Sequence, residues 1–240
     1  PAWEDVEPEP HPALPAGDAA ALRWSFPEGR RFGYDFNQSV RQQTTASQGG
    51  RSGSMTGRDR NGGTFAVVSR GGGVAGVLVT LEAREAYRDD RAVPADELRK
   101  QGPSRFEVEM KEDGSAKIKR VDGASDAQLF FDLLLALREG ERALEGGARV
   151  ATRITGRRKV GRHECVRLET EIEAEGAIPG GRRRMQGRAV GYFDPSAGRF
   201  IRASAVVVAS QRENLKDAKG VWATRAVDSH SSFRLELLER

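Results

Sequence analysis

The clearest pattern in the chain lies in residues 166–193, which read VRLETEIEAEGAIPGGRRRMQGRAVGYF. In residues 166–174, four apolar residues and one threonine alternate with arginine and glutamate. Such alternation is typical of an antiparallel strand with one buried face and one solvated face. The turn residues Pro-Gly-Gly at 179–181 separate this stretch from residues 182–193. The pattern predicts two long strands joined as a hairpin.

The two faces of this hairpin predict one register. Pairing Glu173 with Arg184 places opposite charges side by side on the solvated face. The same register pairs Ile172 with Met185 on the buried face. Because the charged and the apolar pairs agree independently, we expect this register in the folded chain.

A third strand follows at residues 200–211, where apolar and small side chains again share one face. Folding the chain back about the preceding turn places Ala203 opposite Ala189, and Ala205 opposite Gly187. The C-terminal part is therefore expected to be a meander of long antiparallel strands.

The same period of two recurs elsewhere. Residues 32–40 place three aromatic side chains on one face, which predicts a long strand with an aromatic inner stripe. The hairpin around Asp113 is expected to pair Met110 with Ile118, because both then lie on the buried face. Further strands are expected at residues 64–70, 74–87, 106–111, 116–121 and 221–238.

One segment has the pattern of a helix. Ser125 and Gln128 fit a capping box, and Gly140 suits a helix end. Leucine and phenylalanine cover well over half of the circumference between them, too much for a helix on an exposed surface. The predicted fold class is therefore mainly β with one helix (α+β). We expect a large curved antiparallel sheet, or half-barrel, of long meandering strands wrapped around one central helix at about residues 125–139.

Small residues on the inner face of the meander would allow a helix to approach closely. Two alternatives remain open for this space. Either the helix fills it as an ordinary core, which is the favoured alternative, or the concave face holds a lipid or other apolar ligand. In the second case, the candidate ligand-binding residues are Phe130, Leu134, Gly187, Ala189, Ala203 and Ala205.

Residues 1–21 contain five prolines and no apolar period, a composition typical of an extended, unpacked segment. We expect a flexible leader at residues 1–21 and a single antiparallel β domain over residues 22–240. The chain starts at Pro1 without methionine, which is consistent with a removed export signal. The leader is interpreted as a tether to a membrane anchor, with an ordinary frayed terminus as the alternative.

Charge and cysteine content argue against several functions. The 39 basic and 35 acidic side chains leave a net charge of +4, a weak basis for nucleic-acid binding. Cys165 is the single cysteine, so the chain has no intrachain disulfide and no zinc-ligand spacing. The longest apolar run, residues 129–137, is shorter than the roughly 20 residues that a membrane-spanning helix needs. We expect no nucleic-acid partner, no metal and no cofactor.

Catalytic patterns are also weak. The chain has three histidines and no Gly-x-Ser-x-Gly motif. His163 and Cys165 share a strand face, but a partly buried structural cysteine beside a strand-end histidine is the simpler interpretation. The sequence therefore predicts a protein without enzymatic activity and without catalytic residues.

Three stretches resemble a class of uncharacterised bacterial exported lipoproteins. They are residues 22–36 with a Pro-Glu-Gly turn, residues 155–169 with a "Gly, basic, Gly" hairpin, and residues 192–200 with a Phe-Asp-Pro-Ser-Ala-Gly hairpin. The expected architecture is also similar to the half-barrel of periplasmic lipoprotein carriers. This resemblance implies long antiparallel sheets and a place in the periplasm or outer cell envelope, with lipid anchoring. It carries over no catalytic residues.

Two functions follow as hypotheses. The first is a non-enzymatic, exported cell-envelope protein that acts as a binding or scaffolding module for another protein. The alternative is a carrier that holds a lipid or other apolar ligand in the concave face. The expected partner is thus an envelope protein or an apolar ligand, and the membrane is reached only through an N-terminal lipid anchor.

Overall fold

The computed structural model describes residues 11–15, 22–28, 31–122, 135, 137–143, 147–178, 180–216 and 222–238. In this part of the chain, 13 strands form one antiparallel sheet beside a single short helix, α1 (Ala95–Gln101). The strands are β1 (Ala13–Leu14), β2 (Arg31–Gln48), β3 (Arg51–Gly71), β4 (Val74–Arg88), β5 (Arg91–Ala92), β6 (Ser104–Lys111), β7 (Ala116–Asp122), β8 (Gly140–Ala143), β9 (Arg149–Val160), β10 (His163–Ile178), β11 (Gly181–Asp194), β12 (Arg199–Lys216) and β13 (Trp222–Leu237).

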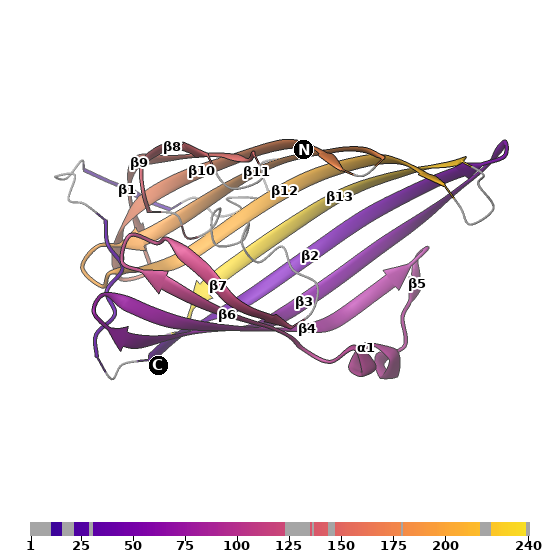
Figure 1. Cartoon of the computed structure of the whole chain (residues 1–240). Coiled ribbons are helices and arrows are strands. Elements are labelled where there is room, and N and C mark those ends of the chain that lie inside the picture. The colour runs from indigo at the N-terminus through magenta and orange to yellow at the C-terminus, as the bar shows by residue number, and fades with distance from the viewer. Residues whose placement is uncertain are drawn as a thin grey trace.

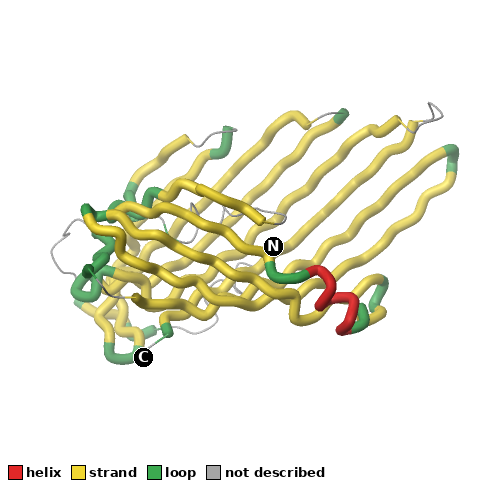
Figure 2. The backbone as a smooth tube through the Cα atoms, turned by 60° about the horizontal axis from the view of Figure 1, so that its bottom comes forward, coloured by secondary structure: helices red, strands yellow, loops and turns green. Residues whose placement is uncertain are grey.

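The sheet is open and curved. Its strand order is β1-β9-β10-β11-β12-β13-β2-β3-β4-β6-β7, with β5 and β8 paired at the side to β4 and β9. Figures 1 and 2 show β6 and β7 curling across the face of the long strands in the middle of the order. Because the described residues contain no pairing between β1 and β7, the sheet is a half-barrel. The predicted fold class is confirmed.

Aromatic side chains fill the interior at one end of this half-barrel. Trp24 lies with its ring 5.5 Å from that of Phe200 and 6.0 Å from that of Phe193. Phe193 and Phe200 pack edge to face at 5.2 Å. They belong to one hydrophobic cluster that also contains Met110 of β6, so the curled end and the long strands share a core. A Cβ atom at Gly191 would lie 2.5 Å from the Phe200 ring, which explains glycine on this face.

The predicted central helix lies largely outside the described residues. Of residues 125–139, only Leu135 and residues 137–139 are described, and none of them is helical. Leu135 and Leu137 are 0% and 4% exposed within the core cluster. The segment therefore contributes side chains to the interior, as predicted. Its C-terminal end is not a helix, since Gly140 already begins β8.

The predicted hairpin register between β10 and β11 is wrong by two residues. Glu173 lies opposite Gln186, and Arg184 lies opposite Glu175. The reason is a tighter turn, in which Ile178 pairs directly with Gly181. A shift of two residues leaves every side chain on its predicted face.

The next two hairpins differ from prediction by the same amount. Ala205, not Ala203, lies opposite Ala189. The turn, in which Asp194 pairs with Arg199, shifts the pairing by one residue, and a bulge between Tyr192 and Phe193 shifts it by one more. Met110 lies opposite Ala116 in the pairing of β6 with β7. There the turn is centred one residue earlier than expected, and the Lys111 amide donates a backbone hydrogen bond to the Ser115 carbonyl across it.

Part of the predicted leader is an edge strand. Ala13 and Leu14 form β1 and pair with Arg158 and Arg157 of β9. The His11 ring packs edge-on against Tyr192 at 4.8 Å. The rest of residues 1–21 lies outside the described part, so the tether stays a prediction.

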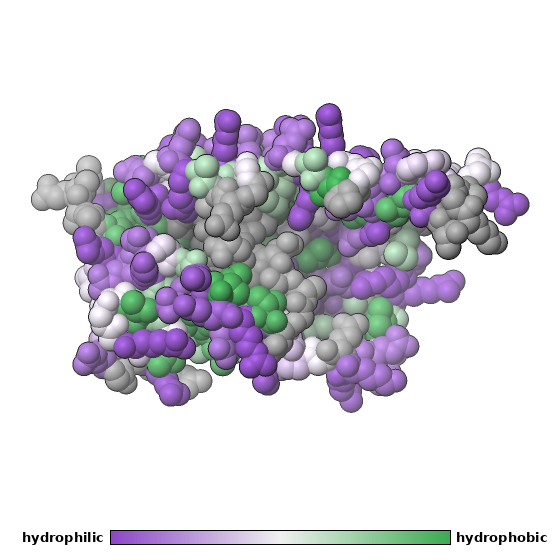
Figure 3. Space-filling view, in the orientation of Figure 1, coloured by the Kyte–Doolittle hydropathy of each residue, from purple (hydrophilic) through white to green (hydrophobic). Residues whose placement is uncertain are grey.

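The sheet changes character along its longest strands. β2 and β3, 18 and 21 residues long, bury Tyr34 and Phe65 at their inner ends. Toward the hairpin that joins them, residues 41–56 are exposed at every position except Thr44. Hydrophilic and near-neutral side chains lie at this end of the molecule in Figure 3. The hydrophobic core therefore occupies only one end of the sheet.

Candidate functional site

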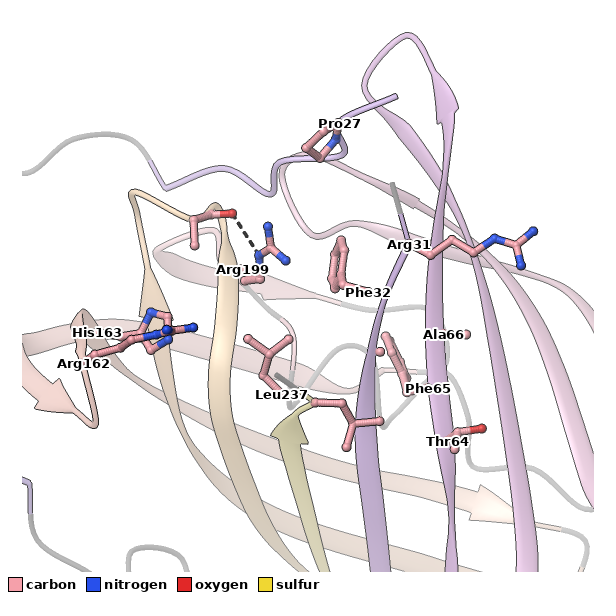
Figure 4. A pocket seen from close by; sticks show the side chains of 13 residues that line it. Pro27, Arg31, Phe32, Thr64, Phe65, Ala66, Arg162, His163, Arg199 and Leu237 are labelled. Carbon is pink, nitrogen blue, oxygen red and sulfur yellow. Dashed lines mark hydrogen bonds between the residues drawn. The ribbon is translucent and has the colours of Figure 1, made fainter. Parts of the chain in front are cut away.

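A cavity of about 640 Å³ lies where β13 ends between its neighbours (Figure 4). β13 stops at Leu237, opposite Tyr34 of β2. On its other side the pairing with β12 stops at Arg202 and Glu236. β2 and β12 both extend beyond these pairs and diverge around the space. The lining residues are Pro27, Arg31, Phe32, Gly33, Thr64, Phe65, Ala66, Arg162, His163, Ala197, Arg199, Leu237 and Leu238.

Four side chains give the cavity an apolar wall: Phe32, Phe65, Leu237 and Leu238. Phe65 is fully buried, whereas Leu238 at the mouth is 40% exposed. Phe32 stacks on the buried Trp24 ring at 6.4 Å, which holds its position. Aromatic and aliphatic walls of this kind are typical of sites for apolar ligands.

Arginine side chains lie at the rim of the cavity. The Arg199 Nε atom donates a hydrogen bond to the Ala197 carbonyl at 3.1 Å. Its guanidinium group lies over the Phe32 ring, 4.6 Å from the centroid. In Figure 4, Arg162 lies beside His163 at the left, and Arg31 lies across from them at the right, with its side chain pointing away from the centre.

His163 is held by a buried carboxylate. Its Nδ1 atom lies 2.7 Å from Oδ2 of Asp194, whose side chain is 6% exposed. The other oxygen, Oδ1, accepts hydrogen bonds from the Ser196 amide and hydroxyl and from the Ala197 amide. Burial alone would raise the pKa of Asp194, but hydrogen bonds from Ser196, His163 and Ala197 outweigh it and hold the pKa below its usual range. The carboxylate thus fixes both the turn and the imidazole.

Cys165 does not form a reactive pair with His163. The cysteine is fully buried in a small apolar cluster with Val190 and Tyr192. Burial, and secondly the charge of Asp194, raises the pKa of its thiol to about 12. Its thiolate, which would be the nucleophile, is therefore scarce at neutral pH. Within the described ranges, no group of three or more His, Cys, Asp or Glu side chains is placed to hold a metal ion.

The four predicted ligand-binding residues that the structure describes lie away from this cavity. Gly187, Ala189, Ala203 and Ala205 sit together on neighbouring strands β11 and β12, buried beneath the core. None of them lines the cavity at the end of β13. Phe130 and Leu134 fall outside the described residues, so a ligand at the predicted place stays a prediction.

The cavity residues were missed because no local motif marks them. They come from six separate stretches of sequence that meet only in the folded chain. The sequence offers one signal for the cavity, which is the end of the last strand. The alternation of Phe233, Leu235 and Leu237 with polar residues stops at Leu238.

A second cavity, of about 550 Å³, is polar. Arg41, Arg58, Tyr87, Asp228 and His230 are among the residues that line it. The Arg58 guanidinium lies 5.0 Å from the centroid of the Tyr87 ring. Most of its lining residues are polar or charged, whereas the cavity at the end of β13 has phenylalanine and leucine side chains in its wall, so the latter is the better candidate for an apolar ligand.

No protein-family model and no curated protein matches the chain. Among solved structures, lipovitellin, whose structure describes lipid–protein interactions, is similar at 13% identity and a TM-score of 0.44. That match covers 90% of this chain but only 26% of lipovitellin. A DUF1329 family protein from Desulfovibrio piger is similar at 13% identity and a TM-score of 0.20, covering 80% of this chain and 83% of that protein. No helix in the described part is long and apolar enough to cross a membrane. At TM-scores of 0.44 and 0.20, the two similar structures assign no family and no ligand to this chain.

Proposed function

We propose that this chain is a non-enzymatic binding protein that carries a lipid or other apolar ligand, held in the cavity at the end of β13. The observation that supports the proposal is the apolar wall of Phe32, Phe65, Leu237 and Leu238 around a volume of about 640 Å³. Ligand pockets commonly have volumes of roughly 300–1,000 Å³. The site differs from the concave-face position expected from the sequence, while the class of ligand is the same.

The binding energy would come from burial of methylene groups. Each buried CH₂ contributes about 0.8 kcal/mol. Two further carbons on an alkyl chain should therefore tighten binding by up to about 15-fold, until the cavity is filled. A rigid, largely preformed wall helps, because Phe32 and Phe65 are already held by stacking and burial.

Isothermal titration calorimetry with hexanol, octanol, decanol and dodecanol tests the proposal. The dissociation constant should fall with chain length and then level off. Leu238→Asn, which places an amide in the apolar wall, should weaken decanol binding at least fivefold.

Leu215→Asn is the matched control, because Leu215 on β12 is also 40% exposed and does not line the cavity. Its decanol affinity should equal that of the wild type. Absence of binding for every alcohol, or equal weakening by both variants, would refute the proposal.

The place of this function in the cell is part of the proposal. The proline-rich leader and the resemblance to exported lipoproteins support a location in the periplasm or outer cell envelope. Cell fractionation of the native host tests it, and recovery in the cytoplasmic fraction would contradict it. A scaffolding role for another envelope protein stays a prediction, for which co-purification is the direct test.

A further inference from the structure

The charge around the cavity is one-sided. Arg31, Arg162 and Arg199 line it, and none of the described lining residues is acidic. The acidic group beside it is Asp194, which makes a hydrogen bond with the cavity residue His163. Both oxygens of Asp194 are already used by His163 and by the turn at Ser196.

Arg199 is the basic group whose position is best defined. Asp194 is its direct partner across β11 and β12, yet the two side chains form no ion pair. Within the described residues, Arg199 has no acidic partner at all. Its Nε atom is held by the hydrogen bond to Ala197, and the plane of its guanidinium group is held by the Phe32 ring. The two terminal nitrogens are thus oriented, and no acceptor among the described residues binds them.

The surroundings of Arg199 favour the binding of an anion. The side chain is partly buried, and its positive charge acts on the fully buried phenol of Tyr34. A charge in such surroundings has lost hydration, and a bound anion would offset that loss. The planar guanidinium matches the two oxygens of a carboxylate or phosphate in a bidentate arrangement.

We propose that the cavity selects amphipathic ligands with an anionic head, a carboxylate or a phosphate, and that Arg199 determines this specificity. The inference rests on the proposed function. The head binds at the Arg199 terminal nitrogens, and the alkyl chain lies along Phe32, Phe65 and Leu237. A neutral ligand of the same length occupies the same wall but lacks the head contact.

Calorimetry with decanoate, decyl phosphate and decanol at pH 7.5 provides the test. At least one of the two anions should bind the wild-type protein at least tenfold more tightly than decanol. A stronger preference for decanoate indicates a fatty-acid-like ligand, and one for decyl phosphate indicates a lipid phosphate. Arg199→Gln should bring the ratio of anion affinity to decanol affinity to within about twofold of one, and Arg199→Lys should retain part of the anion preference.

Arg212→Gln on the same strand is the control, because Arg212 lies outside the cavity and pairs with Asp228. It should keep the full anion preference. Equal binding of decanol and both anions by the wild type would overturn this inference and leave the proposed function standing. Absence of binding by all three probes would overturn both. An anion preference that persists undiminished in Arg199→Gln would refute the role of Arg199.

Discussion

Replacing Ala205 by leucine tests whether the inner face of the meander is a packed core. Ala205 is 1% exposed and lies between Ala189 of β11 and Phe233 of β13. Three extra carbons would have to enter a space that neighbouring side chains already fill. Overpacking of this kind destabilises proteins by about 1–3 kcal/mol. For a chain of this length, this corresponds to a fall in Tm of roughly 2–12 °C.

Urea unfolding followed by circular dichroism measures the change. Ala209→Leu is the matched control, because Ala209 lies on the same strand and face but is only partly buried. We expect its free energy of unfolding to stay within about 0.5 kcal/mol of the wild type. Ala205→Leu should also leave decanol binding unchanged, since Ala205 does not line the cavity. Unchanged stability of Ala205→Leu, or a loss of decanol binding, would show that the inner face holds open space for a ligand.

Two further predictions concern the cluster around His163. Asp194→Asn should lower the free energy of unfolding by about 1–3 kcal/mol at pH 7, because hydrogen bonds to a buried carboxylate are lost. Since the folded pKa of Asp194 is lowered from 3.8, its contribution is present above pH 3.8 and is lost as the pH falls below that value. Urea unfolding between pH 7 and pH 3 should therefore show that the difference in free energy of unfolding between the wild type and Asp194→Asn becomes smaller at acidic pH. A difference that does not change with pH would contradict this. Cys165 should react with a thiol reagent at pH 8 far more slowly in the native protein than in urea, because burial raises its thiol pKa to about 12; equal rates would refute its burial.

The faces of the strands could be predicted from the sequence, and their registers could not. Alternation in residues 166–174 assigns each side chain to a buried or a solvated face, and the structure agrees with this assignment except at Arg167, which was expected on the solvated face and is buried. The same alternation is satisfied by any shift of two residues, so Glu173 could be paired with Arg184 on equally good grounds. The turn at Gly180, whose φ is +76°, selects one of these registers. The alternation of apolar and polar residues does not specify the length of that turn.

The cavity could not be predicted because it depends on where one strand ends relative to two others. Arg199 and Phe32 are 167 positions apart and meet only because β13 stops short between their strands. Helix α1 also went unpredicted. Its acidic first turn at Asp96 and Glu97 is a start signal, but seven residues are too few to show a helical period.

The outer parts of β2 and β3, near the hairpin that joins them, are exposed to solvent on both faces of the sheet. Each of these continuous strands therefore has parts of unequal stability. At about 3.4 Å per residue, β2 is roughly 60 Å long, yet only its inner end is covered by core side chains. Because Tyr34 is buried and Thr45 is exposed, we expect amide hydrogens near Tyr34 to exchange with solvent only when the core opens, and those near Thr45 to exchange by local fraying. The cavity at the end of β13 lies at the buried end. The exposed hairpin can therefore bend or fray without disturbing the cavity, so a mechanical load on its tip would be absorbed before it reaches the lining residues.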